Sequence, residues 1–461
     1  MDINLKLFSF HRKISISKQW MQFGIVVTII LMSTTLAYWA SGETLFWLAV
    51  LMVGFGVIIA LIIQPNLGYL LILVSGMWIP IEGPSNIHAA VLVVALMLGL
   101  WVGDMIIVQR GFRIVSSRVV LPVIVFMVIS VIAFGMGQIP WFVFANQAPL
   151  DSQAGGFAIF MFSAGTLLMT AHILKEERWL QILVWTFIGL STIYMVGRAI
   201  GLSQMDALYH RGFSANSMFW TWFVALTFSQ VVFNNKLRMP VRALLAGIVL
   251  VTFFVAVVQA YNWKSGWIPA LVAAGVIMGL RFPRLLLLSV PVVLLGAYFL
   301  ATGAIGSDEY SWGTRLDAWK IVLEISKVNP VLGLGFSNYY WYTPLFAIRG
   351  WAVTFNSHSQ YVDLIAQVGI LGLLVFLWIF FEVGRLGWRL QQQLPDGFAR
   401  AYTYGVLAGL VGSLLAAFLV DWILPFVYNI GFAGFRASIL IWIFFGGLVS
   451  IEQMYLKKSE T

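Results

Sequence analysis

Long apolar runs, separated by short segments rich in glycine, proline and charged residues, make up most of the chain. A helix needs about 20 apolar residues to cross a bilayer, so each run predicts one crossing. The predicted crossings lie near residues 21–40, 44–63, 67–82, 87–108, 119–137, 155–173, 179–197, 215–233, 241–260, 266–280, 285–302, 361–383, 403–420 and 437–454. The third and tenth are the shortest. The pattern predicts an all-α fold, a polytopic transmembrane helical bundle of about 14 spans (roughly 12–14).

One segment departs from this pattern. Residues 303–360 are much more polar than their surroundings and form the single long loop of the predicted topology. Four of its side chains recur at spacings of three and four residues, which predicts a short amphipathic helix at the membrane interface. They are Leu316, Trp319, Leu323 and Ser326. Thr314 is expected to cap the start of this helix, and Asn329 followed by Pro330 to stop it.

An aromatic cluster follows in the same loop. The sequence Gly333-Leu334-Gly335 predicts a flexible turn, and the cluster after it consists of Tyr339, Tyr340, Trp341 and Tyr342. These side chains suit a surface at the level of the lipid headgroups or stacking on a sugar. We therefore predict that Trp319 and Tyr339 bind substrate.

The chain shows no strong internal repeat or long linker, so the pattern predicts one helical domain with tails. Its predicted parts are an N-terminal tail at 1–20, a transmembrane region at 21–302, a catalytic loop at 303–360, C-terminal transmembrane helices at 361–454 and a tail at 455–461. The apolar first crossing, 21–40, is longer than the core of a signal peptide, which favours a retained anchor over a cleaved leader.

Composition excludes a water-soluble protein, because 61% of the residues are hydrophobic and only 10% are charged. The absence of cysteine excludes disulfides, thiolate metal sites and a cysteine nucleophile. The net charge of +9 is interpreted first as an orientation signal, and no nucleic acid partner is predicted. The expected location is the cytoplasmic (inner) membrane, in contact with its lipids.

The distribution of Lys and Arg predicts that both termini are cytoplasmic. With that orientation, 19 of the 27 basic residues fall in inner segments, as the positive-inside rule requires. The other eight lie against the rule in or beside outer loops. They are Arg198, Arg211, Lys264, Arg315, Lys320, Lys327, Arg349 and Arg436.

Cations gathered at an outer face suggest an anionic ligand, because they cost free energy against the orientation rule and through desolvation. Diphosphate is a natural candidate, since guanidinium groups bind phosphate through two parallel hydrogen bonds. The predicted ligands are Arg211, Lys264, Arg315 and Arg436. The alternative is that these side chains extend to the interface or pair with Asp206, Asp308, Asp317 and Asp421.

His358 is the sharpest single candidate for catalysis. It lies at the end of the polar loop, just before the twelfth predicted crossing. An imidazole titrates near about 6.5, so at neutral pH it can accept a proton from an attacking hydroxyl as a general base. The alternative is an exposed loop histidine without a role. The other histidines are interpreted as structural (His11, His88 and His172) or as a weak substitute (His210).

The sequence lacks the motifs of metal-dependent and nucleotide-dependent enzymes. The sequence has neither the paired histidines nor the clustered carboxylates of a metal site, and it has no Gly-rich loop ending in Gly-Lys-Ser or Gly-Lys-Thr. We therefore expect no metal and no cofactor. The first predicted outer loop is only Ser41-Gly42-Glu43, which disfavours the polytopic glycosyltransferases that carry an acidic metal-binding motif there.

Residues 315–372 resemble the bacterial O-antigen ligase and O-antigen polymerase superfamily. The resemblance is carried by Arg315-Leu316-Asp317-Ala318-Trp319, Asn329-Pro330-Val331-Leu332-Gly333-Leu334-Gly335, Ser357-His358-Ser359-Gln360-Tyr361 and Gln367-Val368-Gly369-Ile370-Leu371-Gly372, with a second patch at Arg211-Gly212-Phe213-Ser214-Ala215-Asn216. Two positions depart from the family pattern. Ser359 stands where Asn is frequent after the histidine, and Lys264-Ser265-Gly266 stands where Ser-Arg-Gly is frequent.

The resemblance implies a metal-independent transferase that moves a glycan from an undecaprenyl diphosphate-linked donor to a hydroxyl of a lipid or glycan acceptor on the outer side of the membrane. It also implies roles for three residues. Arg211 and Arg315 would hold the diphosphate, and His358 would activate the acceptor.

Three alternatives stay open at this level. A polymerase of the same superfamily differs from a ligase only in its acceptor. A transporter or flippase for a lipid-linked sugar would need ionisable residues along a midplane pathway, whereas Asp104, Asp363 and Glu382 lie toward predicted span ends. A purely structural membrane protein would leave the outer cations and His358 unexplained.

Overall fold

The computed structural model describes residues 27, 42–80, 87–284 and 309–457. The chain divides into two compact units, Met1–Ile63 and Gln64–Thr461. In the first unit the described element is helix α2 (Gly42–Ile63). Apart from an isolated bridge between Ile348 and Trp351, the regular structure of the described residues is helical, which confirms the predicted all-α class.

The second unit contains the helices that position the site. The longer ones are α3 (Leu67–Trp78), α4 (Ala89–Gly103), α5 (Val120–Met136), α6 (Leu150–Ile173), α7 (Glu177–Ala199), α10 (Ser217–Phe233), α11 (Met239–Phe254), α12 (Lys264–Arg281), α14 (Glu309–Ser326), α16 (Gln360–Gln393), α17 (Phe398–Leu419) and α18 (Gly431–Glu452). Short helices α8 (Gln204–Leu208), α9 (Arg211–Ser214) and α15 (Asn338–Tyr342) lie in the connections. Single π-helical turns end three helices, at Asp104–Val108, Val255–Gln259 and Gln453–Lys457.

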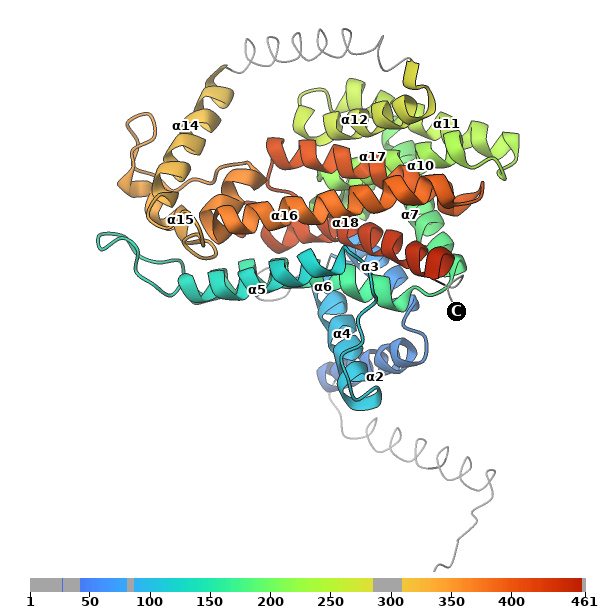
Figure 1. Ribbon diagram of the computed structural model, residues 1–461, viewed down its shortest axis with the longest axis horizontal. Coiled ribbons are helices and arrows are strands. Elements are labelled where there is room, and N and C mark those ends of the chain that lie inside the picture. The colour runs from blue at the N-terminus through green and yellow to red at the C-terminus, as the bar shows by residue number, and fades with distance from the viewer. Residues whose placement is uncertain (1–26, 28–41, 81–86, 285–308, 458–461) are drawn as a thin grey trace, which may run out of the picture. The chain divides into compact units, whose positions relative to one another are not determined.

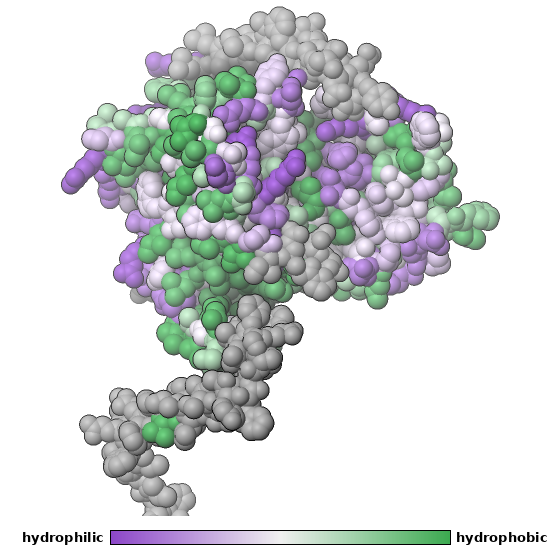
Figure 2. All heavy atoms as spheres, turned by 180° about the vertical axis from the view of Figure 1, so that it is seen from behind, coloured by the Kyte–Doolittle hydropathy of each residue, from purple (hydrophilic) through white to green (hydrophobic). Residues whose placement is uncertain are grey.

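Seven helices of the described residues are long and apolar enough to cross a membrane, and four apolar helices are shorter. Large apolar side chains remain exposed on them, such as Ile107 on the extension of α4 and Leu250 on α11. Figure 2 shows hydrophobic surface spread over one face of the molecule, with hydrophilic groups between. Since exposed apolar surface of this extent requires a lipid environment, the chain is a multi-pass membrane protein.

Every predicted crossing within the described residues contains a helix. The crossings predicted near 21–40 and 285–302 lie largely or wholly outside those residues. Helix α16 runs to Gln393, about ten residues past the predicted end of its crossing. Arg385 and Arg389, which lie beyond the predicted crossing, are therefore part of this helix.

Helices α5, α16, α17 and α18 run side by side, with α14 and α15 at one end (Figure 1). We call the end where α16 begins the His358 end, and the end where α16 finishes the Arg389 end. Almost every residue of α18 is buried, so this helix forms the centre of the unit. The chain alternates between the ends, so α5 and α17 begin at the Arg389 end, whereas α18 begins at the His358 end.

Helix α16 is broken near its start at Gly369, whose φ is 73° and ψ is 179°. The peptide groups freed by the break bond to the loop segment 330–335. Four backbone hydrogen bonds join the two segments: Ile370 N to Pro330 O (2.8 Å), Leu371 N to Val331 O (3.2 Å), Leu334 N to Ala366 O (2.8 Å) and Gly335 N to Gln367 O (3.1 Å). A side chain at Gly369 would place its Cβ 2.0 Å from Val331 O, so only glycine fits.

The loop helix differs from its prediction in two ways. Helix α14 begins at Glu309, so Thr314 lies inside it and does not cap its start. Its buried face is also different, because Val322 and Ile325 pack fully buried in a cluster with residues of α15 and α16, whereas the predicted face residues Leu316 and Leu323 are exposed. Packing against the protein, rather than against lipid alone, therefore sets the orientation of this helix.

Candidate functional site

His358 lies in the turn between the loop and α16, half-buried and in a left-handed backbone conformation with φ of 51°. This conformation is uncommon for a residue with a side chain and persists only where the surroundings hold it. Ser359 follows in extended conformation as the N-cap residue of α16. The turn thus sets where the imidazole points before any ligand is present.

Ser357 fixes this turn through all of its polar atoms. Its hydroxyl donates to Asp363 Oδ1 (2.8 Å) and accepts from the backbone N–H of Ser359 (3.0 Å). Its carbonyl accepts from Trp319 Nε1 (2.7 Å), so the tryptophan of α14 supports the histidine turn directly. Trp319, predicted to bind substrate, has in the structure a partner that positions His358.

Asp363 is the residue that sequence reasoning missed. It lies one turn into α16, is fully buried, and accepts a second hydrogen bond at Oδ1 from the hydroxyl of Tyr339. Its other oxygen, Oδ2, has no partner in the described part of the chain. The signal available in the sequence was an acidic residue about one helical turn after His358. From the sequence, Asp363 was considered only as part of a transport pathway and was not connected with catalysis.

Tyr339 is fully buried, and Phe426 stacks on its ring at a centroid distance of 5.0 Å. This placement leaves no ring face for a sugar, so the prediction of a direct substrate contact by Tyr339 is not supported by its position. Burial and the neighbouring Asp363 raise the pKa of Tyr339 well above its ordinary value. The phenol therefore stays protonated and donates to Asp363.

Arg315 projects from α14 toward the same turn, and its Nη1 donates to the carbonyl of Leu419 at the end of α17 (2.8 Å). Burial, followed by the charge of Arg315, lowers the pKa of His358 to about 4. The imidazole is therefore neutral at neutral pH and can accept a proton. The structure thus brings together His358, Arg315 and Trp319, as the sequence predicted.

A second buried acid, Asp421, lies close by in the connection between α17 and α18. Its carboxylate accepts from Asn429 Nδ2 (2.7 Å) and from the backbone N–H of Phe426 (3.3 Å). Burial raises the pKa of Asp421 to about 6, although these hydrogen bonds and the charge of Arg315 oppose the rise. Among the described residues, Asp421 forms no ion pair with Arg315, and its carboxylate is held by these two hydrogen bonds.

Arg211 begins α9 at the same end of the bundle. Its side chain is exposed and makes no hydrogen bond or ion pair within the described ranges. The neighbouring His210 accepts at Nδ1 from the backbone N–H of Gly212 (3.0 Å), so it caps α9. Arg211 is therefore a free guanidinium held on a capped turn.

Arg436 occupies a different environment from Arg211. It is 1% exposed, and its Nη1 donates to the carbonyl of Ile79 at the end of α3 (2.8 Å). This contact ties α18 to α3, so a direct contact of Arg436 with substrate is not supported by its position. Lys264 opens α12, with its Nζ 5.5 Å from the centroid of the Tyr261 ring.

A row of tryptophans connects the region of Arg211 with that of Arg315. Trp220 donates from Nε1 to the carbonyl of Ser214 in α9 (2.9 Å). Its ring lies 5.9 Å from that of Trp263, which lies 5.5 Å from Trp422, the neighbour of Asp421. Both cationic regions therefore belong to the same end of the bundle, although no hydrogen bond or ion pair joins Arg211 to His358 in the part of the chain that the structure describes.

Three other cations that lie against the orientation rule have acidic partners. Arg198 pairs with Asp206, and Arg349 pairs with Asp317 at 3.0 Å. Lys327 pairs with Glu324 one turn away on α14. These three cations, for which no ligand was predicted, therefore take part in ion pairs within the protein.

Comparison with known proteins gives a family match over part of the chain that includes much of the candidate site. Residues 214–377 match the family described as O-Antigen ligase, which confirms the resemblance to the O-antigen ligase and polymerase superfamily over that segment. No curated protein sequence matches the chain. The matched segment includes Lys264, Arg315 and His358, whereas Arg211 and Arg436 lie outside it. The match indicates a membrane enzyme that processes glycans, with a lipid-linked donor and an acceptor in the membrane.

Proposed function

We propose that the protein is a ligase-type glycosyltransferase that moves a glycan from undecaprenyl diphosphate to an acceptor hydroxyl on the outer face of the cytoplasmic membrane. In this reaction the acceptor oxygen forms a bond to the anomeric carbon, and the bond from that carbon to the diphosphate breaks. The observation that carries the proposal is a neutral, rigidly held imidazole beside an arginine, at the end of the bundle that also holds Arg211.

His358 takes the proton of the attacking hydroxyl. Its low pKa in the free protein reflects burial and the charge of Arg315. A bound diphosphate would offset that charge, and the pKa of the imidazole would then rise, although burial would still hold it below its ordinary value of about 6.5. The base would thus become stronger when the donor is in place, which couples proton transfer to donor binding.

Arg315 and Arg211 would hold the diphosphate and stabilise the negative charge that grows on it as it leaves. A planar guanidinium suits this task because it binds phosphate oxygens through two parallel hydrogen bonds. Arg211 is free to do so, since its side chain has no partner in the described residues. No step in this mechanism uses a metal or a cofactor.

Ser357 and Asp363 serve as positioning residues. They hold the backbone turn of His358 rather than the imidazole itself, through the bonds from Ser357 to Asp363 and from Ser359 to Ser357. Such support keeps a catalytic group within its productive geometry before substrate arrives. The outer placement of this end follows from the cytoplasmic assignment of the more basic segments and of both termini.

The test uses the purified full-length protein with a pool of undecaprenyl diphosphate-linked glycans and lipid acceptors, and it measures released undecaprenyl diphosphate. His358→Asn is the best variant, because Asn tolerates the left-handed conformation but cannot act as a base. We expect release to fall by about 100-fold or more. The control is His172→Asn. His172 lies in the last turn of α6, away from the His358 end, so its replacement should leave the release of undecaprenyl diphosphate unchanged. Equal activity of His358→Asn and wild type would refute the proposal.

Product size decides between the ligase and the polymerase of the same superfamily. A ligase transfers one glycan to a lipid acceptor, whereas a polymerase produces lipid-linked chains of increasing length. Movement of the glycan across the bilayer without release of undecaprenyl diphosphate would instead support a transporter.

A further inference from the structure

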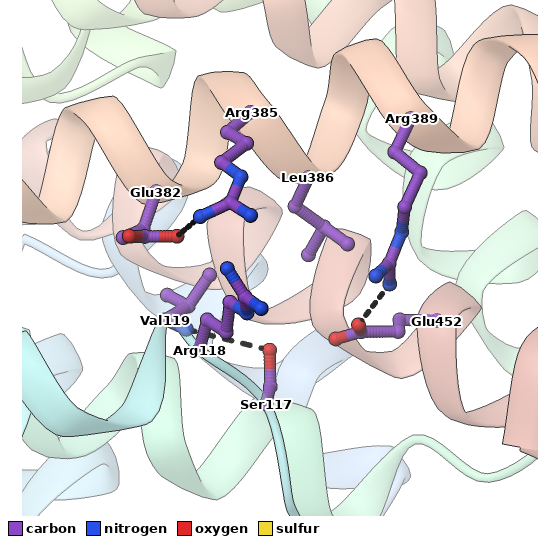
Figure 3. Close-up of a pocket in the computed structure, with 8 residues that line it drawn as sticks. All are labelled: Ser117, Arg118, Val119, Glu382, Arg385, Leu386, Arg389 and Glu452. Carbon is purple, nitrogen blue, oxygen red and sulfur yellow. Dashed lines mark hydrogen bonds and ion pairs between the residues drawn. The ribbon is translucent and has the colours of Figure 1, made fainter.

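A second group of charged side chains lies at the Arg389 end, far along α16 from His358. It lines a pocket that opens to the surface and whose empty space, counted together with that open part, is about 350 Å³. The lining residues are Ser117, Arg118, Val119, Glu382, Arg385, Leu386, Arg389 and Glu452. They come from the segment before α5, from the last turns of α16 and from the end of α18 (Figure 3). The proposed reaction uses none of them.

The charges of the pocket do not balance. Glu382 pairs with Arg385 at 3.7 Å, and Glu452 pairs with Arg389, so two of the three arginines are matched. Arg118 is exposed and makes no ion pair or hydrogen bond through its side chain within the described ranges. One positive charge is therefore left over, in a space that also receives the guanidinium groups of Arg385 and Arg389 (Figure 3).

The remaining polar atoms of the pocket indicate which hydrogen-bonding groups a ligand must carry. Arg385 and Arg389 are about half exposed, so each keeps donors that its carboxylate partner does not use. Glu452 is 5% exposed, and its Oε2 is a buried acceptor without a partner in the described part of the chain. An unfilled acceptor in a positive pocket fits a ligand that carries both an anionic phosphate and a hydroxyl donor.

The surface beside the pocket is apolar. Leu371, Leu374 and Trp378 are 40%, 57% and 36% exposed. They precede Glu382 on α16 at spacings of three and four residues, so they form a stripe on the face of α16 that carries the pocket. Trp378 joins the two, because its Nε1 donates to Glu382 Oε1 (3.4 Å). An acyl chain can follow this stripe into the bilayer while its headgroup lies in the pocket.

We propose that this pocket binds one anionic glycerophospholipid of the bilayer, with its phosphodiester on Arg118 and a headgroup hydroxyl donating to Glu452. The apolar stripe favours a lipid over a soluble phosphate, which has no chain to place there. In the proposed orientation the lipid belongs to the cytoplasmic leaflet, opposite the transfer site. The bound lipid would join the segment before α5 to α16 and α18.

The test is native mass spectrometry of the full-length protein in detergent, titrated with dioleoyl phosphatidylglycerol. We expect Arg118→Ala to weaken binding about tenfold, the usual loss for one charged hydrogen-bonding group. Arg118→Lys, which keeps the charge but not the planar donor group, should lie between Arg118→Ala and wild type. Because Arg118 is exposed and unpaired among the described residues, neither change should impair folding.

Arg113→Ala is the matched control, because Arg113 is an exposed arginine of the same segment that does not line the pocket. It should change binding by less than about twofold. Equal losses in Arg113→Ala and Arg118→Ala would overturn the site and indicate diffuse attraction to the basic segment. Equal retention of dioleoyl phosphatidylcholine would overturn the requirement for an anionic lipid. Competition by glycerol 3-phosphate at the same concentration as the lipid would assign the pocket to a soluble phosphate instead.

Discussion

Both ends of α16 place carboxylates near arginines, but only at the Arg389 end do the carboxylates form ion pairs with them in the described part of the chain. At the Arg389 end, Glu382 and Glu452 pair with arginines that are about half exposed. At the His358 end, Asp363 and Asp421 are fully buried and form no ion pair among the described residues. Their partners are instead hydroxyl, amide and backbone donors, such as Ser357 for Asp363 and Asn429 for Asp421.

This difference teaches what each end is built for. At the Arg389 end the carboxylates are largely buried, but each arginine is about half exposed and keeps donors that can turn to another anion at little cost. A buried carboxylate costs free energy unless donors in fixed positions satisfy it, so the surroundings of Asp363 and Asp421 must be rigid. The Arg389 end is an adaptable charged surface suited to a lipid headgroup. The His358 end is a preorganised site suited to catalysis.

The largest effect is expected from Gly369→Ala at the break of α16. The new Cβ would meet the carbonyl of Val331 at 2.0 Å, and the residue would keep a φ of 73°. We expect a loss of at least about 3 kcal/mol in the free energy of unfolding, measured by thermal or denaturant unfolding in detergent.

Gly384→Ala provides the comparison for this prediction on the regular part of the same helix. Its Cβ would meet only Leu410 Cδ1, at 3.7 Å, so alanine should be neutral or stabilise by up to about 1 kcal/mol. Similar stabilities of the two variants would show that the break is not needed.

The next effect concerns the support of His358. Asp363→Asn should lower kcat of transfer about 10- to 100-fold with little change in KM, because the amide replaces an acceptor that receives two hydrogen bonds. In the His358→Asn background the same change should cause no further loss, since there is no base left to position. An additive loss would show that Asp363 acts on its own. Asp396→Asn, at an exposed ion pair near the Arg389 end, is the control and should leave kcat unchanged.

A smaller effect should appear in the titration of His358. Burial, the larger cause of the low pKa of His358, stays in Arg315→Gln, which removes the charge but keeps an amide that can donate to Leu419; the pKa should therefore rise above about 4 but stay below 6.5. The pH dependence of imidazole modification by diethyl pyrocarbonate measures this shift. Arg349→Gln, which removes another charge of the same loop, should leave the pKa in place.

The same pKa has a consequence for stability. Between about 4 and 6.5 the unfolded chain binds more protons at His358 than the folded protein does, so the free energy of unfolding rises with pH across that window. In Arg315→Gln the pKa of His358 in the folded protein is higher, so the pH range between its folded and unfolded pKa values is narrower. The slope of stability against pH should therefore decrease, and an unchanged slope would contradict the assigned coupling.

The smallest effects are expected at the Arg389 end. Arg385→Ala removes a half-exposed ion pair with a separation of 3.7 Å and should cost less than about 0.5 kcal/mol. Arg389→Ala leaves the carboxylate of Glu452 buried without its cation and should cost about 1–3 kcal/mol. Thermal unfolding of both variants measures the difference. A larger loss of stability in Arg385→Ala than in Arg389→Ala would contradict the conclusion that the buried Glu452 depends more on its arginine than Glu382 does.

The sequence predicted the positions of the helices well, because each long apolar run must be helical in a membrane. It did not predict the break at Gly369, since Gly-x-x-Gly within an apolar run also fits an unbroken helix. The break depends on hydrogen bonds from residues 330–335, which approach only in the folded protein. Nor did the sequence predict the face of α14 that packs against α15 and α16, where Val322 and Ile325 are buried.

The candidate site was predicted where a residue's chemistry is visible without its neighbours. His358 and Arg315 stand out in the sequence because an imidazole in a polar loop and an arginine against the orientation rule are unusual by themselves, and the structure places them beside each other. Asp363, Ser357 and the burial of Tyr339 were missed, because their roles exist only through contacts between α15, α16 and the turn before α16. A sequence alone names reactive groups more readily than the groups that hold them.

The hydrogen bonds between residues 330–335 and 366–371 also determine which part of this chain can be exchanged as a module. A bilayer offers no donors or acceptors to an interrupted helix, so α16 is complete only with its own loop beside it. The ribosome makes that loop first, and it is therefore already synthesised when α16 enters the membrane. Recombination between relatives that cuts between the loop and Gly369 would separate the two partners. A functional exchange would therefore have to carry the segment from α14 past the break as one block.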